Sequence, residues 1–344
     1  MIMKRFITPD MYTGKGEEND LYEMIGLDRL FTRDEIAIPS FDNLITLKCD
    51  LHSHTVFSDG LVWPDARVYE AWQEGLDAIA ITDHIGYQIN GKWLKGDLND
   101  AYEIAMKAAV DMEFIVIKGA EITEDKPFGH FNTLFIQDAN RLKGDDPVAS
   151  IREAVDQGAF VSWNHPGWPD SEVEMQEIHR KLLEKNLVHG IEVMNYKSYY
   201  PVVLKWCHEH HKAILATADA HCSTKSMFRP KLRPMTLVFA EEKSMNGIKE
   251  ALFEGRSAAF FDGKLAGEKK YLEPLVRHCL ELHVMKNECL RVTNASDIPF
   301  CIQRDGQVYA LPEHKTIIMA PSQGGQWKFR NCYVGSEECL EIEF

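Results

Sequence analysis

Between residues 44 and 218, short apolar runs alternate with longer amphipathic stretches. The apolar runs have the length of strands buried on both faces, and they cover residues 44–49, 78–82, 114–119, 131–136, 160–163, 191–194 and 213–218. Helical patterns separate most of these runs, at residues 64–74, 98–111, 148–157, 172–185 and 202–211. Strands that alternate with helices predict an α/β fold whose parallel strands are covered on the outside. Seven such strands, none followed by Gly-x-Gly-x-x-Gly, favour a barrel over a Rossmann sheet.

The composition changes on both sides of this α/β segment. Residues 1–43 carry scattered charges, Pro and Gly, and we expect an N-terminal arm with a short helix between Asp20 and Phe31. One more strand pattern and one more helical pattern complete the barrel, which we place at residues 44–268. Beyond it, short strand-like runs with turn signals between them predict a small antiparallel all-β domain without helices, at residues 269–344.

The charge and the cysteines limit the partners and the compartment. A net charge of -15 argues against broad binding to nucleic acid or to a membrane surface. No run of about 18 apolar residues is present, and the N-terminus lacks the apolar core of a secretory signal. The eight cysteines form no Cys-x-x-Cys pair, which suits free thiols in a reducing compartment, although the five from Cys279 onward could form disulfides in an exported protein. We therefore predict a cytoplasmic protein without a membrane partner.

Side chains that bind metal ions follow five of the predicted strands. His52 and His54 alternate with Ser53, so on a strand both imidazoles face the same way and can bind one ion. The other candidates at strand ends are Asp59, Asp83, His84, Glu121, His165, Asp219 and His221. His130 is the exception, because it precedes its strand. The carboxyl ends of parallel barrel strands meet at the rim that carries the active site, so a shared metal site explains these residues together.

These ordered motifs resemble the PHP (polymerase and histidinol phosphatase) superfamily over residues 44–260. The motifs are His52-Ser53-His54, Thr82-Asp83-His84, Glu121, Gly129-His130, Asn164-His165-Pro166 and Asp219-Ala220-His221. The resemblance implies a distorted seven-stranded β/α (TIM-like) barrel and metal-dependent hydrolysis of phosphoesters at two or three divalent ions. It also implies a set of ligands for each ion: His52, His54, Glu121 and Asp219 for the first, Glu121, His130 and His165 for the second, and Asp59, His84 and His221 for the third. Glu121 would bridge two ions.

The ligand types agree with this chemistry. Mixed imidazole and carboxylate ligands suit Zn²⁺, Mn²⁺ or Fe²⁺. Three divalent ions would exceed the charge of the three carboxylates, so a phosphate dianion would be attracted despite the acidic chain. A hydroxide that bridges two of the ions would serve as the nucleophile. We expect Asp83 to orient His84 or a neighbouring residue rather than to bind metal. Lys197, Lys225 and Arg229 are candidate phosphate contacts, with solvation at the surface as the alternative.

Other functions fit the sequence less well. An amidohydrolase-type C–N hydrolase shares the His-x-His motif and the Asp on the last strand, but the third ion site built with Asp59 favours phosphoesters. A non-catalytic regulatory module would be expected to lack ligands, and none is missing. Long nucleic acids are disfavoured, because no basic stretch with interleaved aromatic residues is present. We predict a phosphatase or phosphodiesterase acting on a small metabolite or nucleotide. The sequence does not indicate the substrate, the metal or the oligomeric state.

Overall fold

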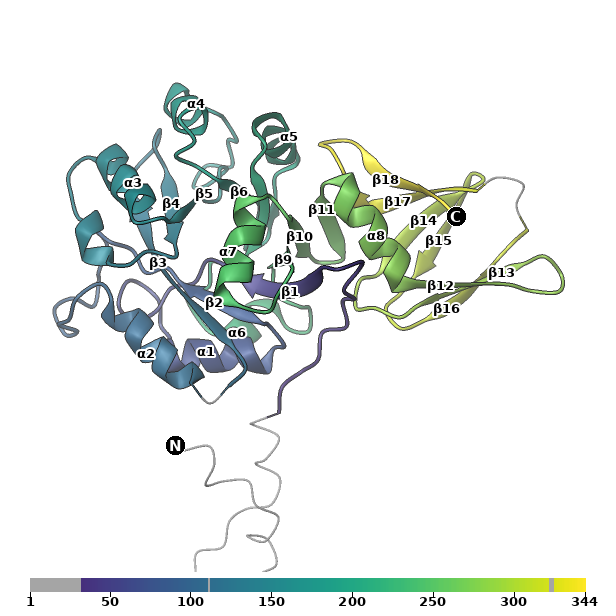
Figure 1. Cartoon of the computed structure of the whole chain (residues 1–344), viewed down its shortest axis with the longest axis horizontal. Helices are drawn as coiled ribbons and strands as arrows, with labels where there is room; N and C mark the ends of the chain where they lie inside the picture. The colour runs from purple at the N-terminus through teal and green to yellow at the C-terminus, as the bar shows by residue number, and fades with distance from the viewer. Residues whose placement is uncertain (1–31, 111, 322–324) are drawn as a thin grey trace, which may run out of the picture.

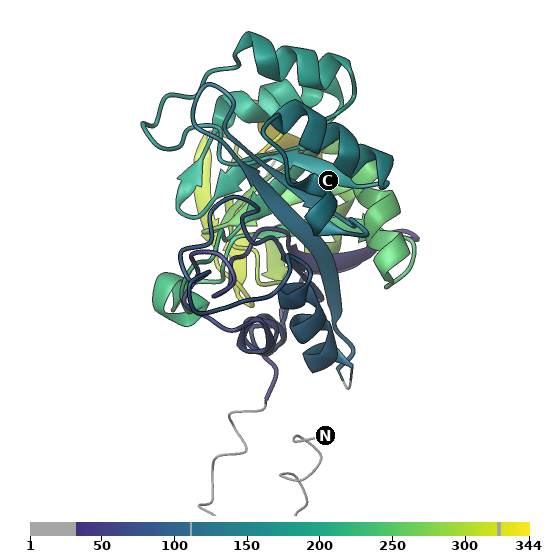
Figure 2. The same ribbon diagram turned by 90° about the vertical axis from the view of Figure 1, so that its left-hand side faces the viewer.

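The computed structural model describes residues 32–110, 112–321 and 325–344. The helix expected between Asp20 and Phe31 lies outside these residues. Figure 1 shows an α/β part that continues into a group of C-terminal strands, and Figure 2 shows these strands behind the α/β part. No helix in the three described ranges is both long and apolar enough to cross a bilayer.

The strands and helices expected from the alternating pattern are confirmed. The strands of the α/β part are β1 (Ile45–Asp50), β2 (Ala78–Ile81), β3 (Ile115–Thr123), β4 (His130–Leu134), β5 (Phe160–Trp163), β6 (Gly190–Asn195), β7 (Ser198–Tyr199), β8 (Ala213–Thr217), β9 (Met235–Ala240), β10 (Ser257–Phe261) and β11 (Lys264–Gly267). The helices are α1 (Pro64–Gln73), α2 (Asp100–Ala109), the 3-10 helix η4 (Ala139–Leu142), α3 (Pro147–Asp156), α4 (Glu177–Glu184), α5 (Pro201–His210), α6 (Thr224–Phe228) and α7 (Met245–Phe253). Proline occupies the first turn of α1, α3 and α5, where its missing N–H costs no hydrogen bond.

The strand directions differ from the expected all-parallel order. β1, β2 and β3 are parallel, and so are β5, β6 and β8. However, β4 runs antiparallel to both β3 and β5, and β9 runs antiparallel to β1. The prediction of parallel strands throughout was wrong at β4, because residues 124–129 are too few for the crossover that a parallel pair needs. The consequence is that β4 begins where β3 ends, with His130 opposite Thr123.

Hydroxyl side chains join β8 to β9 and β10. Ser257 Oγ accepts from the Ile214 N–H and donates to the Ile214 carbonyl, both at 3.0 Å. Thr236 Oγ1 does the same for Ala216, at 3.0 and 2.8 Å. These buried hydroxyls supply donors and acceptors that a neighbouring strand would otherwise provide.

The C-terminal segment begins with a helix, contrary to the expectation of no helix after residue 268. Helix α8 (Lys269–Cys279) buries an apolar face, although Pro274 lies inside it. The strands that follow are β12 (Leu280–Val284), β13 (Leu290–Asn294), β14 (Phe300–Arg304), β15 (Gln307–Leu311), β16 (Thr316–Met319), β17 (Gln326–Tyr333) and β18 (Cys339–Glu343). Strands β12, β13 and β16 form a separate antiparallel sheet, whereas β17 pairs in parallel with β11 and so extends the large sheet.

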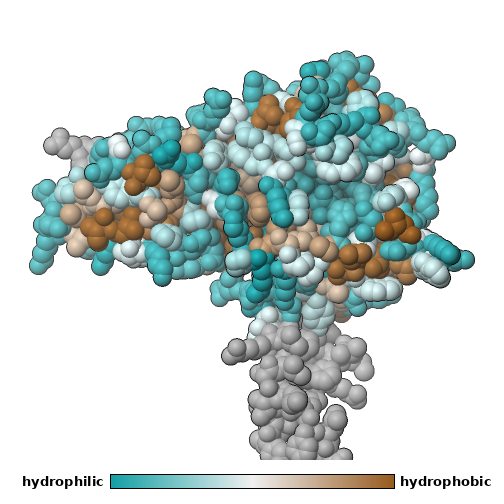
Figure 3. All heavy atoms as spheres, turned by 180° about the vertical axis from the view of Figure 1, so that it is seen from behind, coloured by the Kyte–Doolittle hydropathy of each residue, from teal (hydrophilic) through white to brown (hydrophobic). Residues whose placement is uncertain are grey.

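One hydrophobic core spans the two parts of the chain. Ile36 and Phe41, which precede β1, belong to the same buried cluster as Leu237 on β9 and Trp327 and Phe329 on β17. From behind, the surface is largely hydrophilic, with separate hydrophobic patches over the C-terminal strands at the left and over the α/β part at the right (Figure 3). All eight cysteines are free. The molecule is therefore a mixed α/β structure with a large sheet and a small antiparallel sheet that share an apolar core.

Candidate metal centre

The strand ends bring all nine predicted metal ligands together. The residues after β1 lie between those after β2 and β8, because Ser53 bridges to Ala220 and accepts the N–H of Thr82. His84, after β2, bridges to Glu121 on β3. The reversed direction of β4 places His130 at the same end, where its Nδ1 lies 3.3 Å from Glu121 Oε1. The antiparallel pairing of β3 and β4 thus explains the position of His130, which the predicted order of parallel strands did not.

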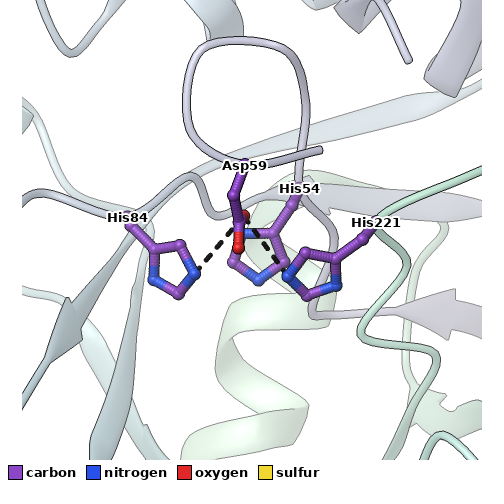
Figure 4. A group of neighbouring side chains, drawn as sticks. All are labelled: His54, Asp59, His84 and His221. Carbon is purple, nitrogen blue, oxygen red and sulfur yellow. Dashed lines mark ion pairs between the residues drawn. The ribbon is translucent and has the colours of Figure 1, made fainter. Parts of the chain in front are cut away.

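Asp59 gathers three imidazoles around one carboxylate. Its Oδ1 lies 3.3 Å from His221 Nε2, 3.5 Å from His84 Nε2 and 3.8 Å from His54 Nδ1. Figure 4 shows Asp59 on the loop after β1, with its carboxylate between the rings of His84 and His221. One ligand atom from each of the four residues lies within 4.8 Å of the others. This group contains the set expected for a third ion, together with His54.

Two further groups share His52. In the first, His52, His54 and Asp219 converge, with 3.0 Å between the two Nε2 atoms and 3.3 Å from each to Asp219 Oδ1. In the second, His52, Glu121 and His165 converge, with Glu121 Oε1 3.4 Å from His52 Nε2 and 3.7 Å from His165 Nε2. Glu121 lies between the groups, where its carboxylate can serve two of them.

The donor set fits divalent metal ions. Glu121, His52 and His54 are fully buried, and two of their neighbours, Asp59 and Asp219, each have a buried Oδ1 without a hydrogen-bond partner among the described residues. An unpaired buried carboxylate oxygen costs free energy unless a cation or a donor satisfies it. A cation at the centre of each group would satisfy these oxygens and the converging imidazole nitrogens together.

The carboxylates also favour protons on the imidazoles. Burial opposes the charge on His52, but the field of the surrounding carboxylates, Asp219 first, raises its pKa well above the ordinary value. Burial likewise opposes the charge on His84, yet the nearby carboxylates of Asp59 and Glu121 raise its pKa to about 10. A metal ion must therefore displace protons when it binds, and its affinity will fall as the pH is lowered.

Asp83 holds the loop that carries Asp59. Its Oδ1 accepts from the Thr55 N–H at 2.7 Å and from Ser58 Oγ at 2.6 Å, and its Oδ2 accepts from Thr55 Oγ1 at 2.7 Å. From the sequence, we expected Asp83 to orient His84 or a neighbour. The structure shows that the oriented element is the turn that precedes Asp59.

Glu192 contacts two of the predicted ligands and was not among the residues predicted from the sequence. It lies fully buried in β6 and accepts hydrogen bonds from His52 Nδ1 at 2.8 Å and from the His165 N–H at 2.7 Å. It also accepts from Thr217 Oγ1 at 2.6 Å and from Asn195 Nδ2 at 2.9 Å. The available signal was a single carboxylate inside the apolar run at residues 191–194, since a buried charge in a strand needs partners.

The three candidate phosphate contacts are not brought to the ligand cluster. Lys197 is exposed and lies over the ring of Tyr196. Lys225 donates to Gln73 Oε1 at 3.1 Å, and Arg229 pairs with Asp34 at 2.9 Å.

A family model described as the PHP domain matches residues 50–225. The chain belongs to the PHP family. It is also 34% identical to a two-domain protein from Bacteroides vulgatus that contains a predicted PHP-like metal-dependent phosphoesterase. That alignment covers 91% of this chain and 98% of the other, with a TM-score of 0.87. Membership in this family agrees with the nine predicted ligands and with the order of their motifs.

Two other solved structures resemble the chain more distantly. A putative metal-dependent phosphoesterase from Bifidobacterium adolescentis is 16% identical over 60% of this chain and 96% of its own, with a TM-score of 0.44. The lesion-specific endonuclease EndoQ from Pyrococcus furiosus is 14% identical over 65% of this chain and 59% of its own, with a TM-score of 0.43. A comparison with curated proteins gave no match.

Proposed function

We propose that this PHP protein is a hydrolase of phosphoesters that acts at two or three bound divalent ions, of Zn, Mn or Fe. One observation carries the proposal: eight of the nine predicted ligands form three groups linked by His52 and His54, and the ninth, His130, lies beside Glu121 of one group. When bound, such ions would activate water and neutralise the charge of a phosphoryl group. Shared ligands would hold neighbouring ions close together, as in-line displacement at phosphorus requires.

The chain's own residues would fix the geometry of this site. Glu192 would hold His52 with Nε2 facing the centre, and Asp83 would hold the turn that carries Asp59. Asn164 Nδ2 donates to Glu121 Oε1 at 2.8 Å and would keep that carboxylate in its bridging position. Most of these groups are buried, so little bulk water competes for their hydrogen bonds.

The finer description of the fold is part of the proposal. We infer a distorted, TIM-like barrel at residues 44–268, because the hydroxyls of Ser257 and Thr236 link β8 across to the other end of the strand series. Residues 269–344 would then be a small second domain, supported by the separate β12–β13–β16 sheet. A small phosphorylated substrate, rather than a long nucleic acid, and a cytoplasmic location agree with the acidic charge and the free cysteines.

The test is hydrolysis of p-nitrophenyl phosphate and bis-p-nitrophenyl phosphate by protein reconstituted with Zn²⁺, Mn²⁺ or Fe²⁺, with the metal ions per chain counted. We expect two or three ions and turnover of one of the two esters, which separates a phosphatase from a phosphodiesterase. His52→Ala should abolish both metal binding and turnover. His283→Ala, at an exposed histidine on β12, is the matched control and should change neither.

Two results would contradict the proposal. If the protein binds no metal ion, the proposed metal-dependent hydrolysis is excluded. Protein that binds two or three ions but hydrolyses neither ester would favour C–N hydrolysis on the same scaffold, which an amide substrate would then reveal.

A further inference from the structure

A cavity of about 330 Å³ opens beside the metal centre. It lies between the β3–β4 loop, residues 124–129, and the segment from the end of β5 into α4, residues 163–179. Two of the predicted ligands, His130 and His165, form part of its wall. A phosphoryl group bound at the ligands would therefore have the rest of its ester directly beside this cavity. The volume suits a small organic group.

The wall next to the ligands is aromatic. The Trp168 side chain is 56% exposed, and its ring centroid lies 5.0 Å from that of His130 and 5.6 Å from that of His165. An exposed tryptophan beside the metal ligands offers a flat face to whatever extends from the phosphoryl group. Such a face attracts cations as well as apolar groups.

Deeper in the wall, a buried donor has no partner. Trp163 is almost completely buried and stacks on His179, with 3.9 Å between the ring centroids. No acceptor for its indole N–H is found within the described residues. His179 is held neutral, because its Nδ1 accepts from the Gln176 N–H while its Nε2 donates to the Phe128 carbonyl. His179 therefore adds no positive charge to the cavity, and the Trp163 N–H is available to an acceptor there.

The charge at the mouth of the cavity is strongly negative. Its lining contains five carboxylates and one amine: Glu124, Asp125, Asp170, Glu172, Glu174 and Lys126. Lys126 is already paired with Asp170 and also donates to the Glu172 carbonyl at 3.3 Å. Within the described part of the chain, the other four carboxylates have no cationic partner. An anionic group in this cavity would be repelled, and a cationic one attracted.

We propose that this cavity binds the alcohol part of the phosphoester and that this alcohol carries a positive charge, as in the ester of an amino alcohol. The proposal rests on the phosphoesterase function proposed above and names its substrate class. The two charges of such a zwitterionic ester match the molecule: the phosphoryl group meets the cationic metal centre, and the ammonium group meets the carboxylates and the face of Trp168. The N–H of Trp163 is available to an acceptor wherever the alcohol part carries one.

The experiment compares two esters of the same shape. Phosphocholine and 3,3-dimethylbutyl phosphate differ only in the nitrogen that carries the charge, and phosphate release measures both. If the enzyme prefers diesters, the p-nitrophenyl diesters of the same two alcohols replace them. We expect kcat/KM for the cationic ester to exceed that for the neutral ester roughly tenfold, as a cation at an aromatic and acidic site implies.

Variants connect this preference to the cavity. The double variant Glu124→Gln, Glu172→Gln should lower the ratio of the two kcat/KM values several-fold, and so should Trp168→Ala. Glu184→Gln, at an exposed carboxylate of α4 outside the lining, should keep the wild-type ratio. A ratio of one or less in the wild type, or a ratio unchanged in the double variant, would overturn the inference. Failure to hydrolyse either ester or the p-nitrophenyl substrates would instead contradict the proposed function itself.

Discussion

Replacing Glu192 by Gln should weaken metal binding without unfolding the protein. Each carboxylate oxygen of Glu192 accepts two hydrogen bonds in the wild type. A glutamine has the same shape but turns one of these oxygens into an NH₂ donor. On the side of His165 and Asn195 that NH₂ would meet two donors, one of them a main-chain N–H that cannot change its role. The amide nitrogen should therefore face His52 and Thr217, which can adapt.

This change of hydrogen-bond roles would impair His52 as a metal ligand. His52 would have to accept at Nδ1, so its remaining proton would move to Nε2, the atom that faces His54 and Asp219 at 3.0 and 3.3 Å. A protonated Nε2 cannot bind a metal ion. Loss of such a partner typically lowers metal affinity roughly 10- to 100-fold, which corresponds to about 1.4 to 2.7 kcal/mol.

A competitive titration against a chromophoric chelator at fixed pH measures this loss. The thermal stability of the metal-free variant controls for unfolding, and Glu184→Gln provides a matched exposed control. If Glu192→Gln binds the same number of ions with wild-type affinity, the assignment of the His52 proton to Nδ1 is wrong.

Three other substitutions test the surroundings of the site. In Gly60→Ala, the new Cβ would lie 2.7 to 2.8 Å from main-chain atoms of the preceding turn, so we expect one ion fewer per chain and a loss of about 1–3 kcal/mol in urea unfolding; wild-type metal content would refute this. Burial lowers the pKa of His189 to about 4 from 6.5, and its Nδ1 accepts from the Val161 N–H, so stability present above pH 6.5 should fall by up to about 3 kcal/mol as the pH approaches 4. The decline should flatten in His189→Gln, and an equal slope in both proteins would exclude His189 as its cause. Arg233→Met leaves the Asp50 carboxylate buried without its cation and should cost about 3–5 kcal/mol, most of it recovered on adding Asp50→Asn; a cost below about 1 kcal/mol would contradict the pairing.

Local patterns were sufficient to predict most strands and helices, and the candidate ligands that the structure brings together. Apolar runs of strand length and the residues just after them are features of short sequence segments. The ends of parallel strands meet at one edge whatever the rest of the fold does, so His54, His84 and Asp219 could be grouped without coordinates. The side of the strand on which each lies follows from the period of two.

The features that sequence reasoning missed depend on distant parts of the chain. The direction of β4 is set by the length of its connection to β3, and an apolar run carries no sign of direction. Glu192 is a single charge within an apolar strand until three donors from other parts of the chain are placed around it. Helix α8 was missed because Pro274 argues against a helix, while the burial of Leu272 and Leu275 in the shared core outweighs that local preference.

Hydrogen bonds at Nδ1 explain how imidazole rings of the site can be oriented before any metal ion binds. His52 Nδ1 donates to Glu192, and His221 Nδ1 lies 2.9 Å from the Asp219 carbonyl. Each of these two rings is therefore held at Nδ1 by the surrounding fold, and its Nε2 faces other predicted ligands. What a metal ion adds is positive charge, which protons otherwise provide to the same carboxylates. The orientation of the ligands belongs to the protein, so binding exchanges protons for metal with little rearrangement of the chain.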